Sequence, residues 1–176
     1  MGLNIEIKAK VRDPAHLRSL LEELCAAPAE AVAQEDIFFQ TENGRLKLRI
    51  LGAHYGELIY YERANVAGPK RSSYLITPCA DPTSLRVLLA AALGTRGVVR
   101  KQRQLYRIGD TRVHLDDVDG LGHFVELEVV LTEGQTCEEG ESIAKQMMKR
   151  LGICEADLVG EAYIDLVEQK GDNSVR

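Results

Sequence analysis

The sequence predicts an α+β fold in which a curved, mostly antiparallel sheet keeps charged side chains on its inner face and carries helices on its outer face. Three observations support this prediction. Several strands alternate charged and apolar residues, which places the two kinds of side chain on opposite faces. Short turns rather than long crossovers join most strands, as in antiparallel sheets. Three amphipathic helices need an apolar surface to cover.

The first half of the chain begins with a strand at residues 4–11 (NIEIKAKV), where polar and apolar residues alternate without a break. Asp13 then caps a helix that has proline at its first position and leucines at helical spacing. Residues 31–50 follow as two strands, because the Asn43-Gly44 pair between them is a strong hairpin signal.

The second half repeats these signals. Two more strands complete the meander, at residues 56–64 and 72–78, and Asp81 caps a second helix that stops at Gly94. The remaining predicted elements are three strands at 97–108, 111–118 and 122–131, a helix at 139–152, and a short helix in the C-terminal segment.

Length and composition restrict the class of protein. The 176 residues can bury one sizeable core, so we expect a single domain over residues 1–168 and a polar, flexible tail at 169–176. The formal net charge of -5 gives no general attraction to nucleic acid or to an anionic membrane, so anion binding must be local. Because the sequence has no apolar signal segment, no membrane-spanning stretch and only scattered cysteines, we expect a cytoplasmic protein.

The charged faces of the strands are sorted by sign. The alternating charges are all basic in residues 45–50 and 101–103, and all acidic in residues 124–129. In an open antiparallel sheet such faces would simply be solvated, and the charges would carry no function. A solvated face has no need of sorting, however, so the pattern favours charged faces on the inside of a curved or closed sheet, where about eight strands can enclose a small ligand.

A basic region beside an acidic region indicates a polyphosphate bound together with a divalent metal ion. Arg and Lys side chains donate charge-assisted hydrogen bonds to phosphate oxygens, and carboxylates are suitable ligands for Mg²⁺ or Mn²⁺. The sequence has no Walker-type glycine loop and no evident Ser-His-Asp or Cys-His group, so we do not expect a covalent mechanism.

The residues resemble those of a known family, the CYTH superfamily or triphosphate tunnel metalloenzymes, over nearly the whole chain. The segment NIEIK is similar to the ExExK motif of the family, with Glu6 and Lys8 in place. The segments QEDIFF, GRLKLR, VRKQRQLY, HLDDVDGLGHFVELE and AYIDLV then follow in the order expected of the family. The resemblance implies an antiparallel eight-stranded barrel whose charged tunnel holds a triphosphate, with helices packed outside.

The resemblance also implies roles for individual residues. The phosphate-binding side chains would be Lys8, Arg45, Lys47, Arg49, Arg63, Lys101 and Arg103. The metal ligands would be Glu6, Asp116, Glu126 and Glu128. In the family Lys8 has a second, catalytic role, in which it positions or activates the attacking group. The remaining nearby polar residues are expected to be surface charges (Lys10, Glu62, Arg107), a packed or orienting histidine (His114), or outward-facing turn residues (Asp117, Asp119).

Asn4 departs from the motif. It stands where the family has the first Glu, so a neutral oxygen replaces a metal-binding carboxylate. Asn can still contact a metal ion or a bound water, but the loss of one negative charge should weaken binding of a second ion.

The predicted function is that of a metal-dependent enzyme that hydrolyses an inorganic or organic triphosphate. One alternative is a class IV-type adenylyl cyclase that converts ATP to cyclic AMP and pyrophosphate. The other is a module that binds polyphosphate or nucleotide without turnover, which Asn4 would favour. The expected partner is therefore a triphosphate or nucleoside triphosphate, with neither nucleic acid nor membrane, and the sequence does not indicate a protein partner.

Overall fold

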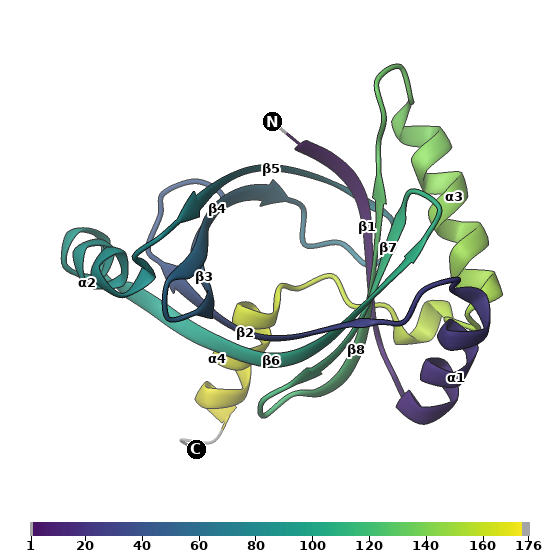
Figure 1. Ribbon diagram of the computed structural model, residues 1–176, viewed down its shortest axis with the longest axis horizontal. Coiled ribbons are helices and arrows are strands. Elements are labelled where there is room, and N and C mark those ends of the chain that lie inside the picture. Colours follow the sequence, from purple (N-terminus) through teal and green to yellow (C-terminus); the bar gives the residue numbers. More distant parts are fainter. Residues whose placement is uncertain (1, 174–176) are drawn as a thin grey trace.

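In the computed structural model, which describes residues 2–173, eight antiparallel strands form a closed barrel, as the sequence predicted (Figure 1). The strands are β1 (Gly2–Lys10), β2 (Glu30–Phe39), β3 (Arg45–Gly52), β4 (Tyr55–Arg63), β5 (Lys70–Cys79), β6 (Thr95–Ile108), β7 (Thr111–Val118) and β8 (Gly122–Val130). The helices are α1 (Pro14–Leu24), α2 (Pro82–Leu93), α3 (Cys137–Arg150) and α4 (Tyr163–Asn173), with a short 3-10 turn at Glu155–Asp157.

The order of strands around the ring is β1-β5-β4-β3-β2-β6-β7-β8, and β1 closes the ring by pairing with both β5 and β8. Glu6 in the middle of β1 thereby lies opposite Lys70 of β5 on one side and Glu128 of β8 on the other. Strand β3 lies across the ring from β8, four places away in either direction. The basic strand and the acidic strand of the sequence therefore face each other across the interior.

Local signals in the sequence fix where most helices begin. The carboxylate of Asp13 accepts a hydrogen bond from the backbone N–H of His16 at 3.0 Å, and Asp81 does the same for Ser84. Helix α3 begins two residues before the predicted start. The reason is a capping box, in which Thr136 and Glu139 each bond the other's backbone N–H.

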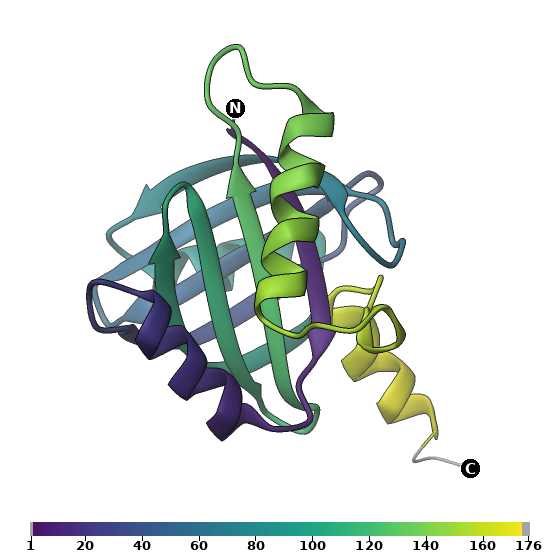
Figure 2. The ribbon, with the colours of Figure 1, turned by 90° about the vertical axis from the view of Figure 1, so that its right-hand side faces the viewer.

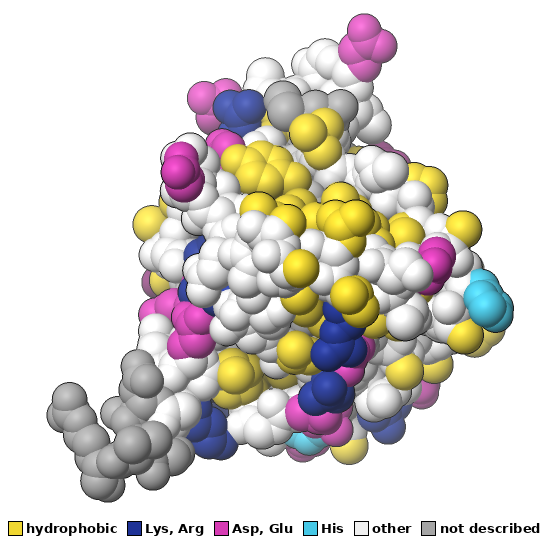
Figure 3. All heavy atoms as spheres, turned by 90° about the vertical axis from the view of Figure 1, so that its left-hand side faces the viewer, with side chains coloured by type: hydrophobic (Ala, Val, Ile, Leu, Met, Phe, Trp, Pro, Cys, Tyr) yellow, Lys and Arg dark blue, Asp and Glu magenta, His cyan; other side chains and the backbone are white. Residues whose placement is uncertain are grey.

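Helices α1 and α3 cover the outer face of β1, β7 and β8 (Figure 2). This face carries the apolar half of each alternating strand, and Ile5, Ile7 and Leu127 are fully buried there. Helix α2 lies against β2, β3 and β4. Its opposite side remains apolar and exposed, with Val87 and Leu88 at 67% and 61% exposure, so yellow side chains gather on this face in Figure 3.

One end of the barrel is closed by the C-terminal segment, which crosses the ring of strands to reach α4 (Figure 1). Residues 159–164 pack against apolar side chains that point inward at this end, among them Phe38, Val99 and Phe124. Helix α4 then runs to Asn173, through part of the tail predicted at 169–176, and residues 174–176 of that tail lie outside the described residues. Among residues 2–173, no helix is long and apolar enough to cross a membrane.

We expect Leu21→Ala to lower the free energy of unfolding by about 2–5 kcal/mol, because Leu21 is fully buried between α1 and the barrel and its loss leaves a cavity. Leu88→Ala, on the exposed side of α2, is the matched control and should change stability by less than about 0.5 kcal/mol. Urea denaturation of both variants measures the difference. Equal effects would contradict the packing of α1 against the barrel.

Candidate active site

The interior of the barrel holds a cavity of about 250 Å³. Its wall consists of the inward-facing residues of the strands, and Tyr163 and Ala162 of the C-terminal segment form its floor. At the opposite end, Ile76 lines the cavity and is 48% exposed. The C-terminal segment therefore covers one end of the cavity, and the end near Ile76 is exposed.

Charged side chains make up nearly half of the lining of this cavity, with twice as many basic groups as carboxylates. The basic residues are Lys8, Lys47, Arg49, Arg63, Lys101, Arg103, Arg107 and Arg112, and the carboxylates are Glu6, Asp36, Glu126 and Glu128. A chain with a net charge of -5 thus encloses a strongly positive interior. Such an excess of buried charge of one sign is unfavourable without a ligand of the opposite sign.

Asp36 of β2 holds the two cations of β3 in place. Its carboxylate accepts hydrogen bonds from Lys47 Nζ at 2.7 Å and from Arg49 Nε at 2.9 Å. Burial by itself would raise the pKa of Asp36, but the nearby cations outweigh burial and hold it well below its ordinary value. Burial lowers the pKa of Lys47 to about 8. Asp36 was not among the site residues predicted from the sequence, although its spacing from Gln34 and Phe38 places all three on the same face of the strand.

Asp116 of β7 plays the corresponding part for β6. It is fully buried and accepts hydrogen bonds from Lys101 Nζ at 3.1 Å, from Arg103 Nε at 2.6 Å and from the hydroxyl of Tyr163 at 3.0 Å. It lies behind these groups and does not line the cavity. Arg103 also donates to Glu126 at 2.6 Å, so one guanidinium joins two carboxylates that were both predicted to bind metal.

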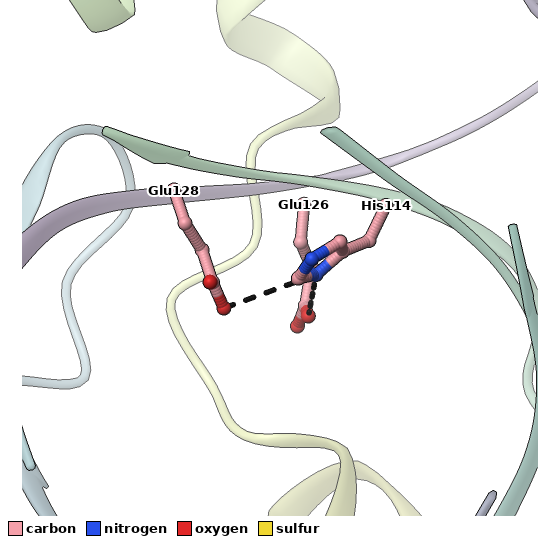
Figure 4. A group of neighbouring side chains, drawn as sticks. All are labelled: His114, Glu126 and Glu128. Carbon is pink, nitrogen blue, oxygen red and sulfur yellow. Dashed lines mark ion pairs between the residues drawn. The ribbon is translucent and has the colours of Figure 1, made fainter. Parts of the chain in front are cut away.

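Glu126, Glu128 and His114 form a group that could hold a metal ion, with potential ligand atoms within 4.8 Å of one another (Figure 4). His114 Nδ1 lies 3.8 Å from a carboxylate oxygen of each glutamate, and it is buried without a hydrogen-bond partner. Burial and the charge of Arg103 lower the pKa of His114, which favours the neutral imidazole that binds metal. Asn4 Oδ1 is a second buried atom without a partner on the cavity wall.

This donor set fits the divalent ion that the family resemblance implies. Carboxylates suit Mg²⁺ and Mn²⁺, and an imidazole nitrogen beside them favours a transition-metal ion over Mg²⁺. Glu6 also lines the cavity, but its carboxylate lies 3.4 Å from Arg63 Nε and is not part of the group. The structure thus brings together two of the four predicted metal ligands and adds His114, which was predicted to be a packed or orienting residue.

Of the eleven predicted site residues, all but Arg45 and Asp116 line the cavity. Arg45 lies at the closed end, where it donates to Asp165 of α4 and to Asn65, each at 2.8 Å. It shares a strand face with Lys47, but its position on β3 is beyond the cavity floor. Arg107, predicted to be a surface charge, is exposed but contributes to the rim of the cavity.

Two further residues of the cavity were not assigned from the sequence. Arg112 pairs with Glu128 at 2.9 Å, and its alternation with His114 could have placed it inside. The ring of Tyr163 lies 3.8 Å from Lys8 Nζ and 4.9 Å from Lys101 Nζ. Tyr163 lies in the AYIDLV segment of the family resemblance, but no strand alternation placed its side chain inside, because it begins a helix.

A closed antiparallel barrel with its charged residues inside is the class of protein that the fold and the cavity define. The sequence of residues 2–163 matches the CYTH domain. Because this match covers most of the chain, the protein belongs to the CYTH domain family, and the resemblance found from its motifs is confirmed.

Similar proteins extend over almost the full length of the chain. A structure from Pyrococcus horikoshii OT3 has 26% sequence identity and a TM-score of 0.81, and the match covers 93% of this chain and 98% of that one. A Methanocaldococcus jannaschii protein with the provisional name adenylate cyclase is 26% identical over 175 residues, covering 93% of this chain and 98% of that protein. A Hippeastrum protein described as a provisional adenylyl cyclase with a dominant triphosphatase activity shares the fold, with a TM-score of 0.63, 17% identity, and coverage of 97% and 96%.

We expect Glu128→Gln to weaken Mn²⁺ binding roughly 10- to 100-fold, because it removes a charged oxygen from the group formed with His114 and Glu126. Glu128 suits this test because it is less tightly paired than Glu126, which contacts both Lys8 and Arg103. Glu42→Gln, in the exposed turn after β2, is the control. Calorimetric titration with Mn²⁺ measures both variants, and equal affinities would place the metal elsewhere.

Proposed function

We propose that this protein is a divalent-metal-dependent hydrolase of a triphosphate compound. The observation that carries this proposal is the cavity itself, in which basic side chains lie across the ring from a carboxylate and imidazole group. A triphosphate needs many positively charged donors, and a metal ion that accompanies it needs oxygen ligands. The lining offers both within one closed-ended space.

In this proposal the triphosphate oxygens are bound by the basic groups of β3, β4 and β6. These are Lys47, Arg49, Arg63, Lys101 and Arg103. Most of them are already oriented by buried carboxylates, so little reorganisation is needed when charge develops on the phosphate oxygens. Arg45 is left out of this set, because it lies beyond the cavity floor and is engaged with Asp165.

The metal would be held by Glu126, Glu128 and His114, where it would polarise a phosphate oxygen and neutralise charge. Asp116 is better suited to orient Lys101 and Arg103 than to contact the ion directly. Lys8 completes the site as the positioning group for the attacking water. Its Nζ lies 3.2 Å from Glu126, and its pKa is lowered by burial although Glu126 opposes the shift.

One alternative, an adenylyl cyclase, is favoured by the provisional name of the M. jannaschii relative. Val32, Leu105 and Ile76 also line the cavity towards its open end, where they would contact an organic group attached to the triphosphate. Hydrolysis remains the preferred function because the cavity supplies phosphate and metal binding directly, whereas cyclisation requires a ribose hydroxyl placed against the α-phosphate.

The products distinguish these functions. We expect the protein with Mn²⁺ or Mg²⁺ to release inorganic phosphate from tripolyphosphate or from ATP, as measured by phosphate assay and chromatography. Cyclic AMP with pyrophosphate would support the cyclase instead. Tight binding without any product would identify a binding module, and the neutral Asn4 in the metal-binding motif would then be its explanation.

The affinity for tripolyphosphate should fall as the pH rises above about 8. Burial lowers the pKa of Lys47 to about 8, so above this value the lysine must take up a proton before it can serve as a cation. The fall should approach roughly tenfold per pH unit for this one group, until the pKa of the bound form is reached.

Lys47→Arg is the matched variant for this prediction, because Arg stays charged over the whole range. Its affinity should decline less steeply than that of the wild type when both are titrated without metal between about pH 7 and 9. The ionisation of the ligand itself is the same for both proteins and cancels in the comparison. Parallel curves would show that Lys47 does not contact the anion.

A further inference from the structure

The segment from Val159 to Tyr163, here called the floor segment, contacts basic side chains at the closed end of the cavity through its backbone. Three side chains, from β1, β4 and β5, donate hydrogen bonds to three successive carbonyl oxygens. Lys70 Nζ donates to Val159 O at 3.5 Å, an Arg63 guanidinium nitrogen to Gly160 O at 2.7 Å, and Lys8 Nζ to Glu161 O at 3.0 Å.

These carbonyl acceptors differ from the carboxylates on the cavity wall. A carboxylate fixes a cation but also neutralises it, as Asp36 does for Lys47. A backbone carbonyl is neutral, so it orients the donor and leaves its full charge available to an anion. Lys8 and Arg63 also pair with Glu126 and Glu6, and the floor segment orients them without neutralising them further.

Gly160 is required for the floor segment to lie where it does. A Cβ atom at this position would come within 2.9 Å of the carbonyl carbon of Val66, and within 3.1 Å of backbone atoms of Asn65 and Ala67. These are backbone atoms, which cannot rotate aside as a side chain can. The floor segment is thus held between the basic side chains on one side and the connection from β4 to β5 on the other.

That connection joins the two strand ends that carry the cations. Arg63 is the last residue of β4 and Lys70 the first residue of β5, so residues 64–69 link them directly. A shift of the floor segment away from this connection would move the acceptors of Arg63 and Lys70 relative to their strands. The close contact at Gly160 therefore sets the geometry of both hydrogen bonds.

We propose that Gly160 is a positioning residue for anion binding: its close contact with residues 65–67 fixes the floor segment, whose carbonyls orient Lys8 and Arg63 of the cavity lining. This inference rests on the proposed function, because it concerns the same cavity. It adds that the floor segment contributes to anion binding, so that the bound anion and the packed position of this segment stabilise each other.

The direct test compares Gly160→Ala with Gly52→Ala. Gly52 is exposed, and no atom of the described residues lies within 4 Å of the place that a Cβ would occupy, so its substitution controls for the added methyl group. Without metal, we expect Gly160→Ala to bind tripolyphosphate about tenfold more weakly, as if one charge-assisted hydrogen bond were lost. Its affinity for Mn²⁺ alone should change much less, because the metal-binding group lies on β7 and β8 and is linked to the floor segment only through the contact of Lys8 with Glu126.

Two results would overturn the proposal. One is an unchanged affinity of Gly160→Ala for tripolyphosphate. The other is a parallel loss of Mn²⁺ and anion affinity, which would indicate general damage to the barrel. If the wild-type protein does not bind tripolyphosphate, the proposed function itself is wrong. If the wild type and the variant bind it equally well, only this inference is wrong.

A measurement on the wild type covers the case in which Gly160→Ala does not fold. The backbone N–H of Val159 donates to Lys8 O at 2.8 Å, and that of Ala162 donates to Asp165 at 3.0 Å. Hydrogen exchange of these two amides should slow when tripolyphosphate binds, since the anion stabilises the packed position of the floor segment. Exchange that is insensitive to saturating tripolyphosphate would contradict the coupling.

Discussion

The burial of charge inside a closed barrel is the constraint on which the rest of this structure depends. Removing a charge from water is unfavourable unless partners replace the lost solvation. Asp36 and Asp116, at 3% and 0% exposure, each accept hydrogen bonds from two basic side chains of a neighbouring strand. These two carboxylates hold the cations in fixed orientations but do not balance them in number. The remaining positive charge suits the cavity to an anion.

The order of strands in the ring determines where the basic and acidic residues lie around the cavity. Because β1 pairs with both β5 and β8, the basic residues of β3 lie across the interior from Glu126 and Glu128 of β8. A ligand in the cavity therefore lies between the basic residues of β3 and a group formed by His114 and two carboxylates, and these carboxylates also pair with basic residues of β1, β6 and β7. A triphosphate with a divalent ion matches this division, since the anion and the cation would each face groups of opposite charge.

The two ends of the barrel differ in whether a segment of the chain packs across them. At one end the inward positions are apolar, as at Phe38 and Phe124, and they pack against the C-terminal segment. At the other end Ile76 is exposed and the cavity opens. The closing segment does more than exclude water. Tyr163 donates to Asp116, and the carbonyls before it accept hydrogen bonds from basic side chains, so this segment also shapes the site.

Alternation along the strands predicted most of the side chains that point inward, because it is a local property of the extended backbone. It placed Glu6 and Lys8 on the inner face, and capping residues located most of the helices. Alternation does not specify height along the barrel, so Arg45 was grouped with the cavity although it lies at the closed end beside Asp165. Nor does alternation predict where a segment that is distant in the sequence packs against the barrel. Only the tertiary structure brought Tyr163 to the floor of the cavity, because that position depends on long-range packing rather than on any repeating local pattern.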